Sequence, residues 1–288
     1  MNNILVTGSK GQVGSELQAL SSAYAYNFYF TDKDELDITD KKAIDAFVHD
    51  NEIDTIINAA AYTAVDQAEE DRDNADAINR LATKYLAEIS KENNIKFVHI
   101  STDYVFDGKN YRPYTEEDST NPNGVYGITK LAGEKAMLAI DPSRSIIIRT
   151  SWVYSSYGSN FVKTMLRLGK ERDSLRVIFD QVGTPTYAKD LAKVILDILP
   201  QIINEEVEIY HYSNEGVLSW YDFAKEIMYM AKIACEVNPI ETKEYPTPAT
   251  RPHYSLLNKA KIKKDFSITI PYWKDSLDNC LEVLGERR

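Results

Sequence analysis

Three residues in the middle of the chain have types and spacing suited to carbonyl chemistry. Tyr126 and Lys130 lie four residues apart in a segment typical of a helix, so both side chains project from one helical face. A nearby ammonium group favours a phenolate and lowers the pKa of a tyrosine, which makes Tyr126 a candidate general acid. Thr102 follows an apolar run, and its hydroxyl is a candidate donor to the same carbonyl oxygen. A tyrosine and a lysine at this spacing also occur on ordinary surfaces, so the pair alone does not establish an enzyme.

A glycine-rich segment near the start of the chain is typical of a phosphate-binding turn. Gly8, Gly11 and Gly14 have the spacing G-x-x-G-x-x-G between an apolar run and a helical segment. Glycines allow a tight turn, and the amides at the following helix start face a pyrophosphate. Asp32, 24 residues after Gly8, has the position of a ribose-binding carboxylate and favours NADH, although it is also typical of a solvated loop. Lys10 and Lys33 partly offset its charge and leave NADPH open.

Short apolar runs alternate with helical segments through the first half of the chain. The sequence predicts strands at residues 4–7, 28–31, 55–58, 96–101 and 145–149. It predicts a helix that follows the glycine turn and ends at about residue 21, and further helices at residues 41–51, 74–93 and 125–140. Strands this apolar, each followed by a helix, indicate a parallel sheet covered on both faces. Right-handed crossovers make this an α/β doubly wound parallel sheet of the Rossmann type. Thr102 then lies at the carboxyl end of a strand, where such sheets bind ligands.

The pattern loosens after residue 150 and predicts a second, smaller domain of mixed α/β structure. Helices are expected at residues 160–170, 187–199, 220–234 and 273–284, and strands at residues 175–179 and 207–212. We assign residues 1–150 to a dinucleotide-binding domain, to which about 175–212 returns, and residues 151–174 and 213–288 to a substrate-binding domain. Prolines exclude regular helix from residues 244–253.

Composition narrows the class of partner. The 288 residues carry 33 Lys and Arg against 44 Asp and Glu, a formal charge of −11, which opposes the phosphate neutralisation that nucleic-acid binding requires. No apolar run approaches a membrane span. Cys235 and Cys280 are too few for a disulfide framework and indicate a cytoplasmic protein. We therefore expect a small-molecule ligand, with neither a nucleic acid nor a membrane as partner.

Eight segments together resemble the extended short-chain dehydrogenase/reductases. They span residues 7–14, 58–63, 101–106, 126–130, 149–154, 160–165, 180–186 and 249–252. The later segments resemble those members that use NADPH or NADH to reduce the C4 ketone of dTDP-4-dehydro-6-deoxy-L-mannose. The product is dTDP-L-rhamnose, and the reaction is the last step of dTDP-rhamnose biosynthesis, which supplies lipopolysaccharide or cell-wall polysaccharide.

The resemblance also implies roles for individual residues. Tyr126 protonates the alkoxide, Lys130 binds the nicotinamide ribose and Thr102 orients the carbonyl. The implied cofactor-binding residues are Gly8, Gly11, Gln12, Val13, Gly14, Asp32, Asp37, Ile38, Ala59, Ala60, Ala61, Tyr62, Thr63, Tyr126 and Lys130. The implied substrate-binding residues are Thr102, Asp103, Tyr104, Trp152, Asn160 and Arg251. Without the resemblance, Trp152 is also typical of core packing.

Some related proteins are magnesium-linked dimers, but the pattern here does not favour a metal. Glu16 fits the first acidic position, whereas Lys189 replaces an expected carboxylate ahead of Asp190. The histidines at positions 49, 99, 211 and 253 have no ligand spacing and are typical of structural residues. We therefore expect no metal, and either a monomer or a homodimer.

Two alternative functions remain open. The first is a reductase or epimerase that acts on another sugar nucleotide. The second is a non-catalytic protein similar to the regulatory subunit of methionine adenosyltransferase, although such a protein need not keep Thr102, Tyr126 and Lys130. Related dehydratases resemble Thr-Asp-Glu where this chain has Thr102-Asp103-Tyr104, and Tyr104 cannot act as a carboxylate base, which favours simple reduction.

Both expected ligands carry a pyrophosphate, so the cleft must be locally positive despite the net charge. The glycine turn provides for one pyrophosphate. For the other, Lys163, Arg167 and Arg251 are the candidate cations, because they lie in or beside the matching segments.

Overall fold

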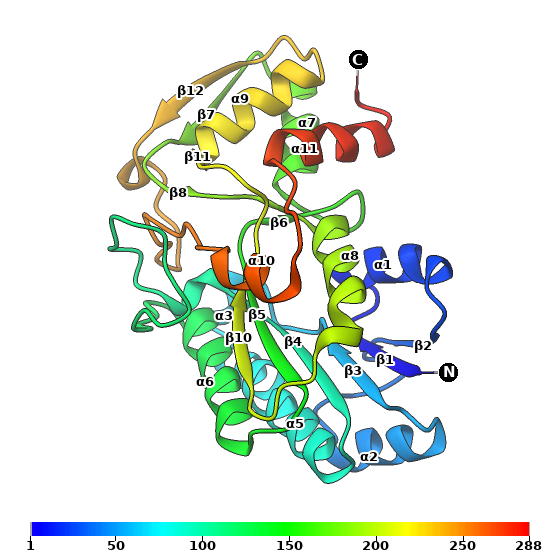
Figure 1. Ribbon diagram of the computed structural model, residues 1–288. Coiled ribbons are helices and arrows are strands. Elements are labelled where there is room, and N and C mark those ends of the chain that lie inside the picture. The colour runs from blue at the N-terminus through cyan, green and yellow to red at the C-terminus, as the bar shows by residue number, and fades with distance from the viewer. Residues whose placement is uncertain (1, 288) are drawn as a thin grey trace.

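Six parallel strands form the main sheet of the computed structural model, which describes residues 2–287 (Figure 1). Their order across the sheet is β10-β5-β4-β3-β1-β2. The strands are β1 (Asn3–Thr7), β2 (Asn27–Thr31), β3 (Thr55–Asn58), β4 (Lys96–Thr102), β5 (Ser145–Thr150) and β10 (Glu208–His211). The centre of the sheet is almost wholly apolar and buried, as expected for a sheet covered on both faces.

Helices cover both faces of this sheet, which confirms the doubly wound fold. One face packs against α1 (Gln12–Leu20), α8 (Ala188–Ile198) and α10 (Ala260–Phe266). The opposite face packs against α2 (Lys41–Asp50), α5 (Ala82–Glu92) and α6 (Val125–Ile140). Successive strand residues alternate between these two cores, because side chains along a strand point to opposite faces: Ile4 and Val6 lie in the first core, Leu5 in the second.

The strand order reverses between β1 and β3. The chain leaves β1 to form β2 on one side and returns to form β3 on the other. A crevice opens at such a reversal, outside the carboxyl ends of the strands. The segments that follow β1, β3, β4 and β5 therefore meet at one edge of the sheet.

A second group of elements stacks above that edge in Figure 1 and has a core of its own. Its helices are α7 (Phe161–Glu171), α9 (Trp220–Met230) and α11 (Trp273–Val283). Its two-stranded sheets pair β7 (Ser174–Ile178) with β12 (Glu236–Ile240), β8 (Val182–Gly183) with β11 (Leu218–Ser219) and β6 (Val153–Tyr154) with β9 (Thr186–Tyr187).

The two strands expected to return to the main sheet differ in outcome. Residues 208–211 join it beside β5. Residues 174–178 instead pair with β12, so that part of the expectation was wrong. The cause is that a short strand pattern does not show which sheet the strand joins: residues 174–178 pair with β12, where Pro239 is tolerated because β12 has one partner strand only in this sheet.

The helix expected at residues 74–93 is formed by three successive pieces. Helix α4 (Arg72–Asp76) passes through one π-helical turn, Ala77–Leu81, into α5. The short helix α3 (Val65–Ala68) precedes them, and short 3-10 turns occupy Ser21–Ala23, Asp103–Val105, Leu199–Gln201 and Thr242–Glu244. Across residues 2–287, none of the helices combines the length and apolar character needed to cross a membrane.

Candidate active site

The glycine turn after β1 is built so that no side chain fits beneath it. Gly8 has φ +69°, and a Cβ there would lie 2.6 Å from the backbone of Ala60. A Cβ on Gly14 would overlap the carbonyl oxygen of Gly8, to which the amide of Gly11 donates at 3.0 Å. No side chain caps the start of α1, so its first amides stay available to an anion. The turn therefore fits the pyrophosphate of a dinucleotide.

Replacing Gly14 with alanine is expected to lower both the melting temperature and the affinity for NADPH, the latter at least roughly tenfold. The added methyl group meets backbone, which cannot rotate away, so the turn and the helix start must separate. Thermal unfolding and fluorescence titration with NADPH measure the two effects. Gly285→Ala is the control for NADPH affinity: a Cβ at that exposed position meets nothing within 4 Å, so the affinity should not change, while its φ of +69° strains an alanine and lowers the melting temperature alone. Wild-type values for Gly14→Ala would contradict this account of the turn.

A cleft of about 770 Å³ lies at the reversal point of the sheet and gathers most of the expected site residues. Its wall includes the segments after β1, β2, β3, β4 and β5 and the start of α6. The expected residues that line it are Gly8, Gly11, Gln12, Val13, Asp32, Asp37, Ile38, Ala59, Ala60, Ala61, Thr63, Thr102, Asp103, Tyr104, Tyr126, Lys130 and Trp152. Residues for a dinucleotide and residues for carbonyl chemistry thus share one cavity.

Three of the expected site residues support the cleft from behind instead of lining it. Gly14 packs under the glycine turn. The Tyr62 hydroxyl donates to Asp71 at 3.1 Å, away from the cavity. The amide of Asn160 donates to Gln12 at 3.0 Å and so holds a residue that does line the cleft.

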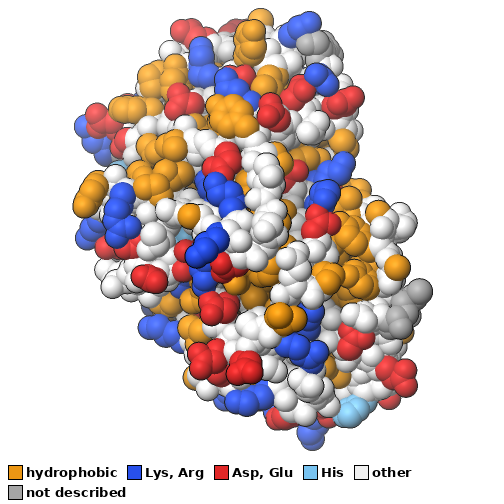
Figure 2. Space-filling view, in the orientation of Figure 1, with side chains coloured by type: hydrophobic (Ala, Val, Ile, Leu, Met, Phe, Trp, Pro, Cys, Tyr) orange, Lys and Arg blue, Asp and Glu red, His pale blue; other side chains and the backbone are white. Residues whose placement is uncertain are grey.

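The proposed cations for a second pyrophosphate have other partners. Arg251 donates to both carboxylate oxygens of Asp66, at 3.1 and 2.7 Å, and joins the second group of elements to α3 at the edge of the cleft. Arg167 pairs with Glu171 on the exposed surface of α7, and Lys163 donates to a backbone carbonyl. Arg167 and Lys163 are therefore not cleft cations, and that expectation was wrong. Figure 2 shows acidic and basic side chains interspersed over one face of the molecule.

At the ribose end, the carboxylate of Asp32 ties the glycine turn to the end of β2. It accepts from the amide of Lys10 at 3.1 Å and from the amide of Lys33 at 2.8 Å. The ammonium of Lys10 faces Asp34 and Glu35, at 3.2 and 3.3 Å. Lys33 lines the cleft beside Asp32. Because Lys10 faces Asp34 and Glu35, Lys33 is the lysine that offsets the charge of Asp32.

Lys130 lies in the cleft, and its amino group contacts strand β4. Its nitrogen Nζ donates to the carbonyl of Ile100 at 2.7 Å and lies 3.3 Å from Nε2 of His99. Burial raises the pKa of Tyr126 to about 12, although the Thr102 hydroxyl opposes the shift. The expected lowering of the phenol pKa was wrong, because the cost of burying a phenolate is the larger effect. Tyr126 consequently keeps its proton at neutral pH.

Asp103 is the most perturbed carboxyl group of the cleft. Burial raises its pKa to about 7, although the hydrogen bond from Thr102 lowers it. The Thr102 hydroxyl donates to its Oδ1 at 3.0 Å, while Oδ2 has no hydrogen-bond partner within residues 2–287. A buried carboxyl group that lacks one partner is available to a polar group of a ligand.

Asp103→Asn is expected to change the pH dependence of stability. Because the pKa of Asp103 is raised on folding, its carboxyl group favours the folded state below its ordinary pKa of 3.8, and this contribution is lost as the pH rises through about 7. Asparagine does not titrate, so the variant should melt at a higher temperature than the wild type at about pH 8, with a smaller difference near pH 5. The control Asp107→Asn should show the opposite sign, because hydrogen bonds lower the pKa of Asp107. Parallel melting curves at both pH values would contradict the shift.

The second group of elements contributes cleft residues that the sequence reasoning did not single out. Ser151, Val153, Gly158 and Ser159 line the cavity beyond β5. Trp152 has φ +48° and stacks on Trp220 with ring centroids 3.7 Å apart. A positive φ in a tryptophan is strained, and such strain gathers at functional sites. The signal that could have identified Ser151 and the cleft residues after it is that they directly follow the buried strand β5.

Asn79, in the π-helical turn, is a second residue that sequence reasoning missed. Its amide bonds both the N–H and the carbonyl of Tyr62, at 2.9 and 3.2 Å, and donates to Thr129 of α6 at 3.1 Å. It therefore holds the cofactor-side loop 59–63 against the helix that carries Tyr126. π-Helical turns are frequent at functional sites, but the sequence gives no signal for one.

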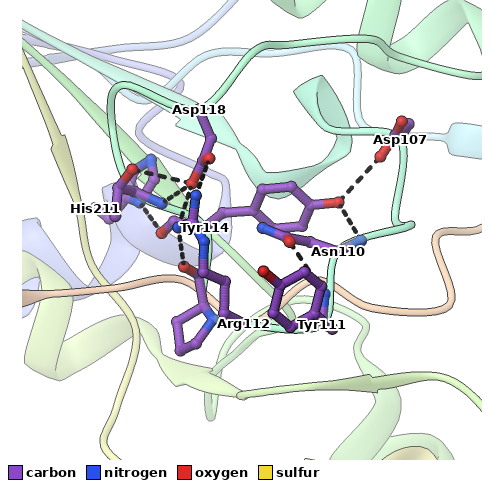
Figure 3. A network of polar contacts seen from close by, with 9 residues as sticks. Asp107, Asn110, Tyr111, Arg112, Tyr114, Asp118 and His211 are labelled. Atoms are coloured by element: carbon purple, nitrogen blue, oxygen red, sulfur yellow. Dashed lines mark hydrogen bonds and ion pairs between the residues drawn. The ribbon is translucent and has the colours of Figure 1, made fainter.

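Figure 3 shows how the loop between β4 and α6 is held in place. Tyr114 donates to Asp107 at 3.0 Å, and its carbonyl accepts from Nδ1 of His211 at 3.1 Å. Arg112 and Asp118 form a two-point ion pair, at 2.7 and 3.1 Å. These contacts fix the segment that connects Thr102, at the end of β4, to Tyr126, at the start of α6.

The acidic positions considered for a magnesium ion are occupied by protein partners. Glu16 accepts a hydrogen bond from Ser155 at 2.6 Å, and Asp190 accepts one from Asn214 at 2.7 Å. Within residues 2–287 no three His, Cys, Asp or Glu side chains form a group suited to a metal.

The fold and the cleft define a dinucleotide-binding oxidoreductase of the extended short-chain dehydrogenase/reductase type. The chain belongs to the family described as "RmlD substrate binding domain", whose model matches residues 1–285. The resemblance that the motifs indicated is thereby confirmed.

Three relatives illustrate the similarity. A dTDP-4-dehydrorhamnose reductase of Aggregatibacter actinomycetemcomitans is 44% identical over 97% of this chain and 98% of that protein. The crystal structure of such a reductase from Clostridium acetobutylicum has a TM-score of 0.94 at 41% identity, covering 98% of this chain and 99% of that one. One from Bacillus anthracis, in complex with NADP, has a TM-score of 0.94 at 38% identity, covering 98% and 100%.

Proposed function

We propose that this chain uses NADPH or NADH to reduce the C4 ketone of dTDP-4-dehydro-6-deoxy-L-mannose to dTDP-L-rhamnose, the last step of dTDP-rhamnose biosynthesis. The observation that carries the proposal is the single cleft in which the glycine turn meets Thr102, Tyr126 and Lys130. The relatives named as reductases of this substrate, similar over nearly the whole chain, support it.

The bound nicotinamide supplies a hydride to the ketone carbon. The amides of the glycine turn hold the pyrophosphate, and Lys130 binds the nicotinamide ribose. Tyr126 donates its phenolic proton to the ketone oxygen as negative charge develops there, and the Thr102 hydroxyl turns from Asp103 to donate its hydrogen bond to the same oxygen. A relative solved with NADP supports the choice of cofactor.

The sugar is assigned to the side of the cleft formed by Asp103, Tyr104 and Trp152. Tyr104 follows Asp103 where an eliminating enzyme needs a second carboxylate, so reduction is favoured over loss of water. Arg251 is the remaining candidate for the pyrophosphate of the sugar nucleotide. It lies close enough to Tyr104 for its positive charge to lower the pKa of that phenol, against the larger opposite effect of burial. Binding would require Arg251 to exchange its contact with Asp66.

We further propose a domain organisation, a cellular location and an oligomeric state for the protein. Residues 1–150 form the dinucleotide-binding domain and residues 151–174 and 213–288 the main part of the substrate-binding domain. The protein acts in the cytoplasm, which is supported by two cysteines that are both buried and unpaired. It acts as a monomer or a homodimer on a nucleotide sugar.

The test measures oxidation of NADPH and NADH with a panel of dTDP- and UDP-linked 4-keto-6-deoxy sugars. We expect stoichiometric oxidation with the dTDP-linked substrate and formation of dTDP-L-rhamnose. Tightly bound NAD with no net consumption would establish an epimerase instead. Failure to consume either cofactor with every sugar would favour the non-catalytic alternative.

A further inference from the structure

A row of three polar residues crosses the core of the main sheet next to the cleft. Thr7, Asn58 and His99 are direct partners in the strand register of β1, β3 and β4. Their exposed fractions are 1%, 0% and 0%. Two positions earlier on each strand, the same face carries apolar residues of the core beneath α5 and α6. Polar groups buried in such a core are costly unless each one is hydrogen-bonded, so the row requires an explanation.

The contacts of Asn58 fix the direction of its amide. Its oxygen Oδ1 accepts from the Thr7 hydroxyl at 2.7 Å and from the backbone N–H of Ala60 at 3.2 Å. A backbone N–H only donates, so the group that faces it must be the oxygen. The NH₂ group of Asn58 then points at Nδ1 of His99, 3.1 Å away.

This direction determines which nitrogen of His99 carries a proton. An amide NH₂ only donates, so Nδ1 must accept. Burial keeps the pKa of His99 well below its ordinary value, and the ring is therefore neutral with a single N–H. That proton must lie on Nε2, which faces Nζ of Lys130 at 3.3 Å.

Lys130 can accept the hydrogen bond from Nε2–H of His99 only when its amino group is uncharged. An ammonium group has donors alone and would meet the N–H of His99 head-on, whereas an uncharged amine has a lone pair that accepts it. The amine can still donate to the carbonyl of Ile100. Among the charged neighbours, Glu134 on the same helix favours the ammonium, but its carboxylate is bound by Arg149 of β5.

We propose that His99 is a positioning residue for Lys130: its Nε2–H, fixed by Thr7 and Asn58, holds the amino group at the cleft and favours its uncharged form. Burial, which lowers the pKa of Lys130 to about 8, acts in the same direction. The inference rests on the proposed function insofar as the Lys130 charge affects reduction of the ketone. In that reaction the row sets the pH above which Lys130 no longer supplies a positive charge beside Tyr126.

The inference can be tested without any substrate. In protein labelled with ¹⁵N at histidine, the nitrogen shifts of His99 report which ring nitrogen is protonated, and the His99→Gln variant identifies its signals among the four histidines. We expect a protonated Nε2 and an unprotonated Nδ1. A proton on Nδ1 of the wild-type protein would overturn the inference, whatever the enzyme reduces.

Asn58→Asp is the variant that should reverse the tautomer. Aspartate keeps an acceptor for Thr7 and Ala60, and its second oxygen accepts from a proton on Nδ1 of His99. Nε2 then becomes an acceptor that suits the ammonium of Lys130. We expect the nitrogen shifts of His99 to reverse and the alkaline limb of the kcat–pH profile to move up by about one unit or more.

The negative charge introduced by Asn58→Asp would also act through space, and a double variant separates the two effects. If the effect of Asn58→Asp passes through His99, most of the shift in the alkaline limb of the kcat–pH profile should disappear when His99→Gln is also present. A full shift in that background would overturn the positioning role. If the tautomer behaves as expected but no sugar nucleotide is reduced, the proposed function fails while the assignment of His99 stands.

Discussion

Tyr126→Phe should lower kcat by about 10²–10⁴-fold, the usual contribution of a positioned general acid. The substitution removes one oxygen and leaves the ring in place. Because the pKa of Tyr126 is raised to about 12, the wild-type residue carries its proton at any working pH and can release it only to a strong base such as the developing alkoxide. The dissociation constant for NADPH should change little, since the glycine turn that binds the pyrophosphate is untouched.

Tyr104→Phe is the matched control for this result. Tyr104 lines the same cleft, and its ring packs edge-on against that of Tyr126 with centroids 5.4 Å apart. Losing that hydroxyl should affect KM for the sugar more than kcat. Steady-state oxidation of NADPH and a fluorescence titration measure both variants. A near-normal kcat for Tyr126→Phe would remove it as the acid.

The sheet and its cleft could be predicted because they depend on local patterns. The glycine turn directly follows a buried strand, and Thr102 ends another, so the rule that parallel sheets bind ligands at their carboxyl ends places both at one edge. The boundaries of the predicted strands at residues 55–58 and 145–149 lie within one residue of those observed. Apolar runs flanked by turns specify such strands without knowledge of their neighbours.

Contacts between distant segments could not be predicted in this way. Helical spacing placed Lys130 beside Tyr126, but only the packing of α6 on β4 shows that its amino group reaches Ile100 and His99. His99 looked structural because it lacks metal-ligand spacing, and its alignment with Asn58 depends on strand register. The partner of Arg251 is 185 residues away, and nothing local in the sequence indicates Asp66.

The buried ion pair between Glu134 of α6 and Arg149 of β5 should produce the largest effect on stability. Their side chains are 0% and 3% exposed, and Arg149 donates to Glu134 at 2.7 and 3.0 Å. The Ser101 hydroxyl donates to the same carboxylate. Arg149→Met would leave this carboxylate buried without its cation, at a cost of about 3–5 kcal/mol in the free energy of unfolding.

The double variant Arg149→Met, Glu134→Leu shows whether the lost stability comes from an unpaired buried charge or from lost side-chain packing. It removes both charges, so most of the lost stability should return even though neither native side chain is restored. Lys193→Met breaks the exposed pair with Asp197 and should change the free energy of unfolding by less than about 1 kcal/mol. Urea unfolding measures all three variants. Equal destabilisation by the single and double variants would mean that packing, and not the unpaired carboxylate, holds α6 and its catalytic residues against the sheet.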